Sequence, residues 1–139
     1  MFRTIIWFGH FTLSLIGTLP KISKVKRLKA KGRLEEAEEY INKTTSDWAK
    51  AQVKMSGATI KVYGEENLPK EETVLFMSNH QGNFDIALFM SHIPVAKGYI
   101  AKLEMKKIPI LRTWMEFIHC VFMDRSNLRK SAEAIALGV

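Results

Sequence analysis

The segment SNHQGNFD, residues 78–85, brings a histidine and a carboxylate within five positions of each other. An imidazole accepts a proton near neutral pH, and a carboxylate bonded to it fixes its tautomer and stabilises its charged form. On a continuous helix, five residues turn through about 500°, which leaves His80 and Asp85 roughly 140° apart. The two side chains can meet only if the chain turns between them, and Gly82 permits such a turn.

Spacing alone leaves two interpretations of this loop open. In the first, His80 is a general base, and because no serine or cysteine is paired with it, the nucleophile is a substrate alcohol. In the second, the histidine and the aspartate only satisfy backbone groups of a polar turn, as turn residues commonly do. In both, Asn83 is the expected cap of a following helix, and Asp85 falls in its first turn, where the helix dipole stabilises the anion.

The loop lies between a predicted strand and a predicted helix, which is where open α/β sheets place their sites. TVLFMS, residues 73–78, is a continuous apolar run, typical of a strand buried on both faces. The remaining pattern predicts strands over 58–64, 98–102 and 120–124 and helices over 84–93, 109–119 and 125–138. The alternation of strands and helices predicts an α/β fold, a mostly parallel sheet flanked by helices, over residues 57–139.

An N-terminal part, residues 1–56, is predicted to be a membrane-associated pair of helices joined by a basic linker. Residues 4–19 are largely apolar, and as a helix they extend roughly 24 Å, short of a ~30 Å hydrocarbon core. Such a helix either spans the bilayer, with the Arg3 side chain reaching to the headgroups, or lies in the membrane–water interface. The alternative is a buried helix in the core of a soluble protein. Residues 21–33 carry seven positive charges and no negative charge, which favours anionic lipid and places the following chain on the cytoplasmic face.

Residues 33–56 predict an amphipathic helix that Gly57 ends. Its apolar positions share one face, and the helix either packs on the following domain or also lies along the bilayer. The expected face consists of Leu34, Ala37, Ile41, Trp48 and Met55.

Composition narrows the classes of partner and site. The chain has 139 residues and a formal charge of +7, which favours anionic partners such as phosphate groups, acidic lipid or an acidic carrier protein. We expect no nucleic-acid partner, because no surface of interleaved basic and aromatic residues is identifiable. Cys120 is the only cysteine, which excludes an intramolecular disulfide and a zinc site of the usual cysteine spacing, so no metal is expected.

The residues NHQGNFD resemble the NHxxxxD motif of the glycerolipid acyltransferases, the 1-acyl-sn-glycerol-3-phosphate acyltransferase family. The approach GATIKVYGEENLPKEETVLFMS and the later segment YIAKLEMKKIPILRTWMEFIHCVFMDR are similar to that family too, so the resemblance runs over residues 57–137. The motif loop is then made of Asn79, His80, Gln81, Gly82, Asn83, Phe84 and Asp85.

The resemblance implies roles for particular residues. His80, assisted by Asp85, would deprotonate the sn-2 hydroxyl of lysophosphatidate, and the oxygen would attack the thioester of an acyl-CoA or acyl-carrier protein, with no cofactor. Arg125 would bind the substrate phosphate, and Lys102 would be a second cation. The alternatives are a surface pair of Arg125 with Asp124 and a solvated strand end at Lys102.

One family block does not occur in the sequence, the Phe-Pro-Glu-Gly-Thr-Arg segment that also binds phosphate. We therefore expect the sheet to be incomplete and the chain to correspond to the N-terminal part of the family's domain. Two alternatives to phosphatidate synthesis stay open. The acceptor is glycerol phosphate or another lysophospholipid, or the chain is a catalytically incomplete fragment that binds a lipid surface.

Overall fold

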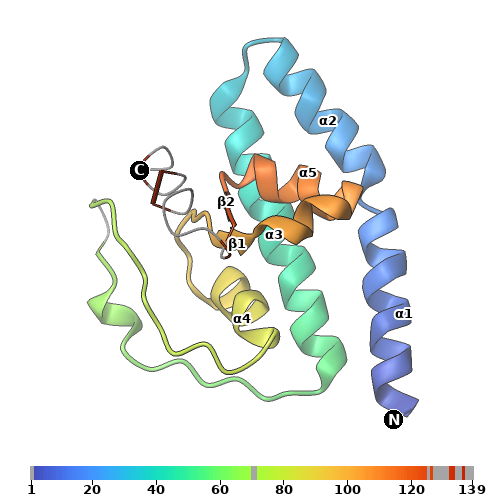
Figure 1. Ribbon diagram of the computed structural model, residues 1–139, viewed down its shortest axis with the longest axis vertical. Coiled ribbons are helices and arrows are strands. Elements are labelled where there is room, and N and C mark those ends of the chain that lie inside the picture. The colour runs from blue at the N-terminus through green and yellow to red at the C-terminus, as the bar shows by residue number, and fades with distance from the viewer. Residues whose placement is uncertain (1, 70–71, 125, 127–131, 134–135, 137–139) are drawn as a thin grey trace.

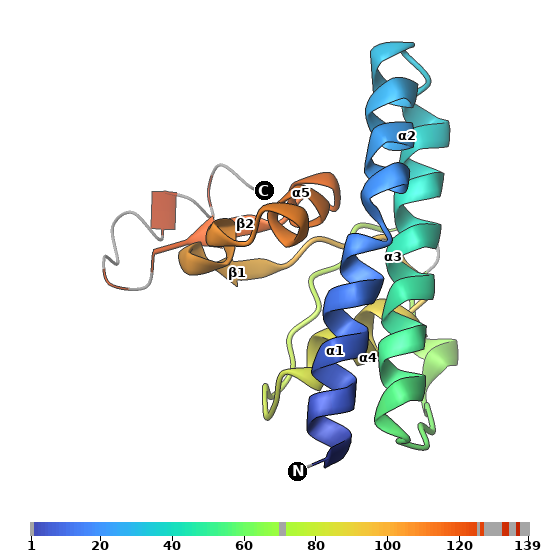
Figure 2. The same ribbon diagram turned by 90° about the vertical axis from the view of Figure 1, so that its right-hand side faces the viewer.

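A computed structural model describes residues 2–69, 72–124, 126, 132–133 and 136. Three helices form its long axis: α1 (Phe2–Ile16), α2 (Leu19–Ala30) and α3 (Leu34–Ser56). In Figure 2, α1 and α2 follow one another along nearly one line, and α3 returns antiparallel beside both. The described residues therefore form a mostly helical structure, with a small sheet to one side of these helices.

The break between α1 and α2 falls at Gly17 and Thr18. The Thr18 hydroxyl donates to the carbonyl of Leu15 at 2.6 Å. Pro20 lies at the start of α2, because a helix accepts proline only in its first turn. Taken together, Thr4–Ala30 is the one described helical stretch long and apolar enough to cross a membrane, and 17% of its most apolar window is buried. Length, composition and exposure thus agree with the predicted membrane-associated segment.

The predicted helix over 33–56 is confirmed as α3, and Gly57 ends it in the left-handed conformation at φ 75°. Its buried face differs from the predicted one, because Leu34 and Met55 are exposed. The face instead combines Ala37, Ile41, Thr44, Thr45, Ala49, Gln52 and Val53. Polar residues therefore occupy positions that an apolar pattern could not predict.

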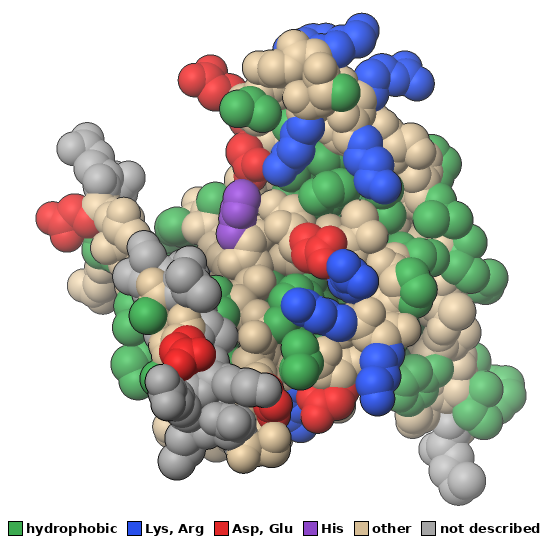
Figure 3. Space-filling view, turned by 45° about the horizontal axis from the view of Figure 1, so that its top comes forward, with side chains coloured by type: hydrophobic (Ala, Val, Ile, Leu, Met, Phe, Trp, Pro, Cys, Tyr) green, Lys and Arg blue, Asp and Glu red, His purple; other side chains and the backbone are tan. Residues whose placement is uncertain are grey.

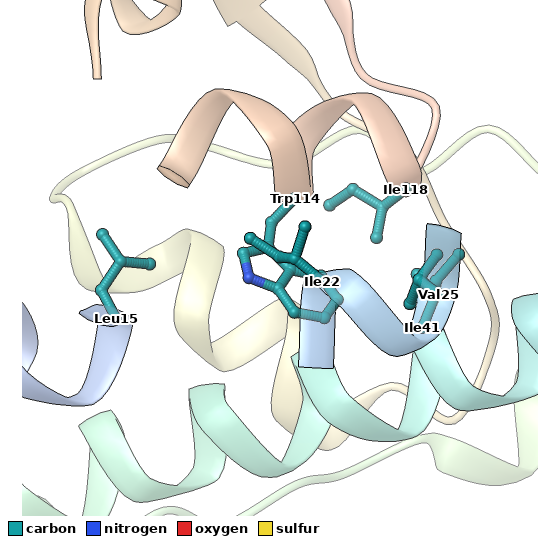
Figure 4. Close-up of a cluster of buried hydrophobic side chains, with 6 residues drawn as sticks. All are labelled: Leu15, Ile22, Val25, Ile41, Trp114 and Ile118. Atoms are coloured by element: carbon teal, nitrogen blue, oxygen red, sulfur yellow. The ribbon is translucent and has the colours of Figure 1, made fainter. Parts of the chain in front are cut away.

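The core joins the helices to the later part of the chain. Trp114 and Ile118, from the end of α5 (Pro109–Phe117) and the residue after it, pack against side chains of the first three helices (Figure 4). The Trp114 indole N–H also donates to the Thr18 hydroxyl at 2.8 Å, across 96 positions of sequence. The cluster consists of Leu15, Ile22, Val25, Ile41, Trp114 and Ile118.

The sheet has two strands, β1 (Ile100–Lys102) and β2 (Val121–Met123), which pair in parallel with Lys102 opposite Met123. A 3-10 helix, η2 (Leu103–Lys107), and α5 connect them. The helix α4 (Phe84–His92) packs on α3. The predicted helices at 84–93 and after Pro109 and the strands at 98–102 and 120–124 are confirmed, whereas the helix predicted over 125–138 falls largely outside the described residues.

Two predicted strands are wrong. Residues 58–64 and 73–78 form no strand. The described residues between α3 and α4 follow an extended course that the 3-10 helix η1 (Glu65–Asn67) interrupts (Figure 1). A strand requires a partner for its backbone groups, and no described residue pairs with these segments. Leu75 and Met77 are 81% and 86% exposed, whereas the Phe76 ring lies 6.3 Å from that of Phe89. The run is thus half-buried and alternating, not buried on both faces.

Candidate active site

The motif loop turns so that His80 and Asp85 meet. One carboxylate oxygen, Oδ2 of Asp85, lies 2.9 Å from His80 Nδ1. The same oxygen accepts the backbone N–H groups of Gln81 at 2.7 Å and Gly82 at 2.9 Å. The Asp85 N–H in turn donates to the Gly82 carbonyl at 3.1 Å, which closes the turn at the start of α4.

The loop reaches this geometry without two features that the sequence predicts. Asn83 occupies the N-cap position of α4, but its side chain makes no capping hydrogen bond, and the Asp85 carboxylate bonds the loop N–H groups instead. Gly82 is not among the described glycines with positive φ, and a Cβ built there meets nothing within 4 Å. The turn therefore does not depend on the conformational freedom of glycine, and open space lies beside Gly82.

The hydrogen bonds that hold Asp85 also stabilise its charge. The backbone N–H groups of Gly82 and Gln81 lower the pKa of the Asp85 carboxyl below its ordinary value. Burial opposes them, and the His80 side chain lowers the pKa by a smaller amount. The carboxylate also lies in the first turn of α4, where the helix dipole favours an anion. Asp85 is therefore ionised at neutral pH.

An ionised carboxylate only accepts hydrogen bonds, so Nδ1 of His80 carries the proton that it shares with Asp85. In the neutral imidazole with that tautomer, the other ring nitrogen, Nε2, carries a free lone pair. The His80 side chain is 61% exposed and that of Asp85 is 27% exposed, so the imidazole is open to a second molecule while its partner is more enclosed. This arrangement is suited to removing a proton from a hydroxyl that approaches from solvent.

The two predicted phosphate-binding residues have different outcomes. Lys102 is the last residue of β1 and is exposed, and among the described residues no hydrogen bond or ion pair joins it to His80 or Asp85. Arg125 lies outside the described residues. Its neighbour Asp124 accepts the backbone N–H and the hydroxyl of Ser126, at 3.0 and 2.6 Å. The parallel register places the ends of β1 and β2 at the same edge of the sheet.

Sequence reasoning missed a contact between the loop and α1. The Trp7 ring lies 5.1 Å from the ring of Phe84, the motif residue that precedes Asp85. The Trp7 indole N–H donates to the backbone carbonyl of Gln52 on α3 at 3.3 Å. Trp7, His10 and Ser14 recur at helical spacing, which places them on one side of α1, but that spacing does not identify Gln52, which all three contact in the structure.

The part of the chain that the structure describes contains no group of three or more His, Cys, Asp or Glu side chains arranged to hold a metal ion. A cavity of about 170 Å³ lies between α3 and the segment after α4, and neither His80 nor Asp85 lines it. The His80–Asp85 pair therefore lies on the exposed loop and outside this cavity.

A family model described as Acyltransferase matches residues 59–137, more than half of the chain. That range contains the whole motif loop, Lys102 and Arg125. No solved structure matches the chain significantly.

Curated relatives carry related names. A probable 1-acyl-sn-glycerol-3-phosphate acyltransferase of Mycoplasma pneumoniae is 32% identical over 85 residues, 58% of this chain and 32% of the relative. A 1-acyl-sn-glycerol-3-phosphate acyltransferase of Saccharomyces cerevisiae is 32% identical over 85 residues, 61% of this chain and 28% of the relative. A lysophosphatidylcholine acyltransferase 1 of Danio rerio is 35% identical over 82 residues, 55% of this chain and 15% of the relative. The chain thus spans about a third or less of the length of these relatives.

Proposed function

The chain belongs to the Acyltransferase family, and from this premise we propose that it transfers a fatty acyl group from an acyl thioester to the sn-2 hydroxyl of 1-acylglycerol-3-phosphate, giving phosphatidate. The names of the Mycoplasma and yeast relatives support this acceptor. The donor is acyl-CoA or an acyl-carrier protein, and no cofactor takes part. The reaction belongs to phospholipid synthesis.

The observation that carries the proposal is the 2.9 Å contact between Nδ1 of His80 and the Asp85 carboxylate. It leaves Nε2 of His80 to take the proton of the acceptor hydroxyl while the hydroxyl oxygen attacks the thioester carbonyl carbon. The carbon–sulfur bond then breaks, and the departing thiolate takes the proton from the imidazolium. Asp85, ionised and held by two backbone N–H groups, stabilises the imidazolium between these steps.

We assign the phosphate of the acceptor to Lys102, at the edge of the sheet, and to Arg125, which follows β2 in the sequence. Lys102 ends β1, and Met123, its partner in β2, lies two residues before Arg125. A planar guanidinium suits a phosphate because it donates two parallel hydrogen bonds, and an ammonium adds a second charge. Arg125 is therefore the proposed main phosphate ligand and Lys102 the secondary one.

Membrane association completes the proposal, because both the acceptor and the product are lipids. The outward side of α1 exposes large apolar side chains, and the basic residues of α2 follow directly. Such a pairing suits the boundary of an anionic leaflet. We place the chain on the cytoplasmic face, on the rule that basic residues beside an apolar segment remain on that side.

The direct test is acyl transfer by the purified chain in lipid vesicles, with labelled acyl-CoA and 1-acylglycerol-3-phosphate. His80→Ala is expected to lower kcat by about 10²–10⁴-fold, the usual contribution of a positioned general base. His92→Ala, at the other end of α4 and bonded to Ser91, is the matched control and is expected to keep the rate. Equal rates for wild type and His80→Ala would overturn the catalytic role. Lipid binding without turnover by the wild type would favour the incomplete fragment.

A second acceptor class is favoured by one comparison. The zebrafish relative is named for lysophosphatidylcholine, and it matches this chain at 35% identity. A panel of lysophosphatidate, lysophosphatidylcholine and glycerol phosphate separates the candidates. Preference for the zwitterionic acceptor would move the proposal from phosphatidate synthesis to lysophospholipid acylation.

A further inference from the structure

The contact between Trp7 and Phe84 joins the apolar N-terminal helix to the motif loop. The two ring centroids are 5.1 Å apart with the ring planes at 52°, within the range of a favourable aromatic pair. Phe84 is the first residue of α4, and Asp85 follows it directly. Packing of the Phe84 ring therefore restrains the helix turn that carries the carboxylate.

Trp7 itself is fixed from several sides. Its indole N–H donates to the Gln52 carbonyl at 3.3 Å, and its ring also lies 5.3 Å from that of Phe11. Gln52 is 1% exposed, and its side-chain amide donates to the Ser14 hydroxyl at 3.0 Å. The helix α1 is thus bonded to α3 at Trp7 and, two turns later, at Ser14, so the ring is a fixed surface for Phe84.

The motif loop has little other support of its own. His80, Gln81, Gly82 and Asn83 are all exposed, and the hydrogen bonds that shape the loop end on Asp85. The placement of Asp85 then depends on the first turn of α4. Packing on α3 holds α4 as a whole. The first residue of α4, Phe84, has in addition a ring contact with Trp7 of α1.

From these contacts we propose that Trp7 is a positioning residue for the His80–Asp85 pair, acting through the Phe84 ring. The inference rests on the proposed function, because it assigns the pair a reaction to perform. It also joins two parts of the molecule with different surroundings. Trp7 is on the inner side of α1, while Ile5, Phe8 and Leu13 are exposed on its outer side, so the lipid-facing helix and the reactive loop pack as one unit.

The test compares three substitutions in the full chain, assayed in vesicles with an acyl-CoA and 1-acylglycerol-3-phosphate. Trp7→Ala removes both the ring contact and the bond to Gln52, whereas Phe84→Leu removes the ring contact alone. Both are expected to lower kcat by roughly 10–100-fold with a smaller effect on KM, because misplacement of a reacting group by about 1 Å can cost that much. Thr12→Ala removes an exposed polar side chain from the same helix and is expected to keep kcat.

A second measurement does not depend on turnover. The amides of Gln81 and Gly82 donate to Asp85, so their hydrogen exchange reports the loop directly. Exchange is expected to accelerate in Trp7→Ala and Phe84→Leu, to stay slow in Thr12→Ala, and to recover in Trp7→Phe, which keeps an aromatic ring.

The outcomes separate the two proposals. Wild-type exchange and kcat in Phe84→Leu and Trp7→Ala would overturn the role of Trp7 while leaving the proposed function standing. If Trp7→Ala unfolds, as judged by circular dichroism, Phe84→Leu decides the question alone. If His80→Ala retains the wild-type rate, the proposed function fails, and faster amide exchange in Phe84→Leu would still establish that the ring contact positions the loop.

Discussion

At the scale of single residues, Asp85 organises the loop because one of its oxygens accepts three hydrogen bonds, from His80, Gln81 and Gly82. An amide oxygen can accept the same bonds, but it carries no charge to stabilise an imidazolium. We therefore expect Asp85→Asn to fold like the wild type and to lose roughly 10²-fold in kcat, the lower end of the range for acid–base groups. Steady-state kinetics in vesicles measures the loss. An unchanged kcat would show that the charge of Asp85 does not assist the reaction.

The same carboxylate gives the stability a pH dependence of known sign. The pKa of Asp85 is lower in the folded chain than its ordinary value, so the ionised form stabilises the fold. This contribution is fully present above the ordinary pKa near 3.8, and it is lost as the pH falls through the lower, folded pKa. Urea unfolding from pH 6 to pH 2 is expected to show a shallower acid loss in Asp85→Asn than in the wild type.

A control for that measurement comes from α3. The hydrogen bond from Lys43 lowers the pKa of Asp47 in the same direction, with 2.6 Å between Lys43 Nζ and the carboxylate. Asp47→Asn is therefore expected to make the loss of folding stability in acid shallower, as Asp85→Asn does, but to leave the rate of acyl transfer unchanged. Equal acid profiles of Asp85→Asn and the wild type would contradict the assigned effect of the loop hydrogen bonds.

At the scale of elements, the segment that leads into β1 packs tightly against the connection between α5 and β2 at one glycine. A Cβ added to Gly98, two residues before β1, would lie 2.6 Å from the His119 carbonyl oxygen and 2.9 Å from that of Ile118. His119, between α5 and β2, has a φ of 57°, which is unusual for a residue other than glycine. Both neighbours are backbone atoms, so Gly98→Ala must move the connection into β2.

We expect Gly98→Ala to lower the free energy of unfolding by about 1–3 kcal/mol, as overpacking of a close contact does. Gly82→Ala is the matched control, because its Cβ meets nothing within 4 Å, and a change within about 0.5 kcal/mol is expected there. Urea denaturation of both variants measures the difference. Equal free energies of unfolding for the two variants would mean that the backbone near His119 moves to accommodate the added Cβ without loss of stability.

The elements also show what a sequence can and cannot predict. The amphipathic pattern and the Gly57 stop predicted α3 correctly, because local periodicity and a left-handed cap determine it. The strands at 58–64 and 73–78 were wrong because a strand depends on a partner that its own residues do not specify. His80 and Asp85 could be selected from type and spacing, but their contact required the loop geometry.

The Trp7 contact shows the same limit more strongly. Trp7 and Phe84 are separated by most of the N-terminal part, and nothing in the spacing of either residue indicates the other. The buried Gln52 that anchors Trp7 occupies a core position with a polar side chain, which apolar periodicity assigns to the surface. Long-range polar contacts of this kind follow from the tertiary packing and not from local pattern.

At the scale of the whole molecule, apolar and basic surfaces adjoin. In Figure 3, hydrophobic side chains gather along the side of the molecule where α1 lies, and Lys and Arg side chains gather at the end where α2 lies. The largest exposed apolar side chains of α1 are Phe2, Ile5, Phe8 and Leu13, and basic residues exposed on α2 include Lys21, Lys24, Lys26 and Arg27. A bilayer with anionic headgroups matches both surfaces at once.

Charge reversal on α2 tests that match quantitatively. Each basic residue near an anionic leaflet contributes about 1 kcal/mol, so the double variant Lys26→Glu, Arg27→Glu is expected to weaken binding to anionic vesicles by about 2 kcal/mol or more, roughly 30-fold. The variant Lys61→Glu, Lys107→Glu changes the net charge equally at exposed positions outside α2, and it is expected to bind like the wild type. Cosedimentation at rising salt measures both, because screening shortens the range of the attraction from about 10 Å at 0.1 M to about 3 Å at 1 M. If both double variants weaken binding equally, only net charge attracts the chain; if neither does, the apolar face of α1 holds it to the bilayer alone.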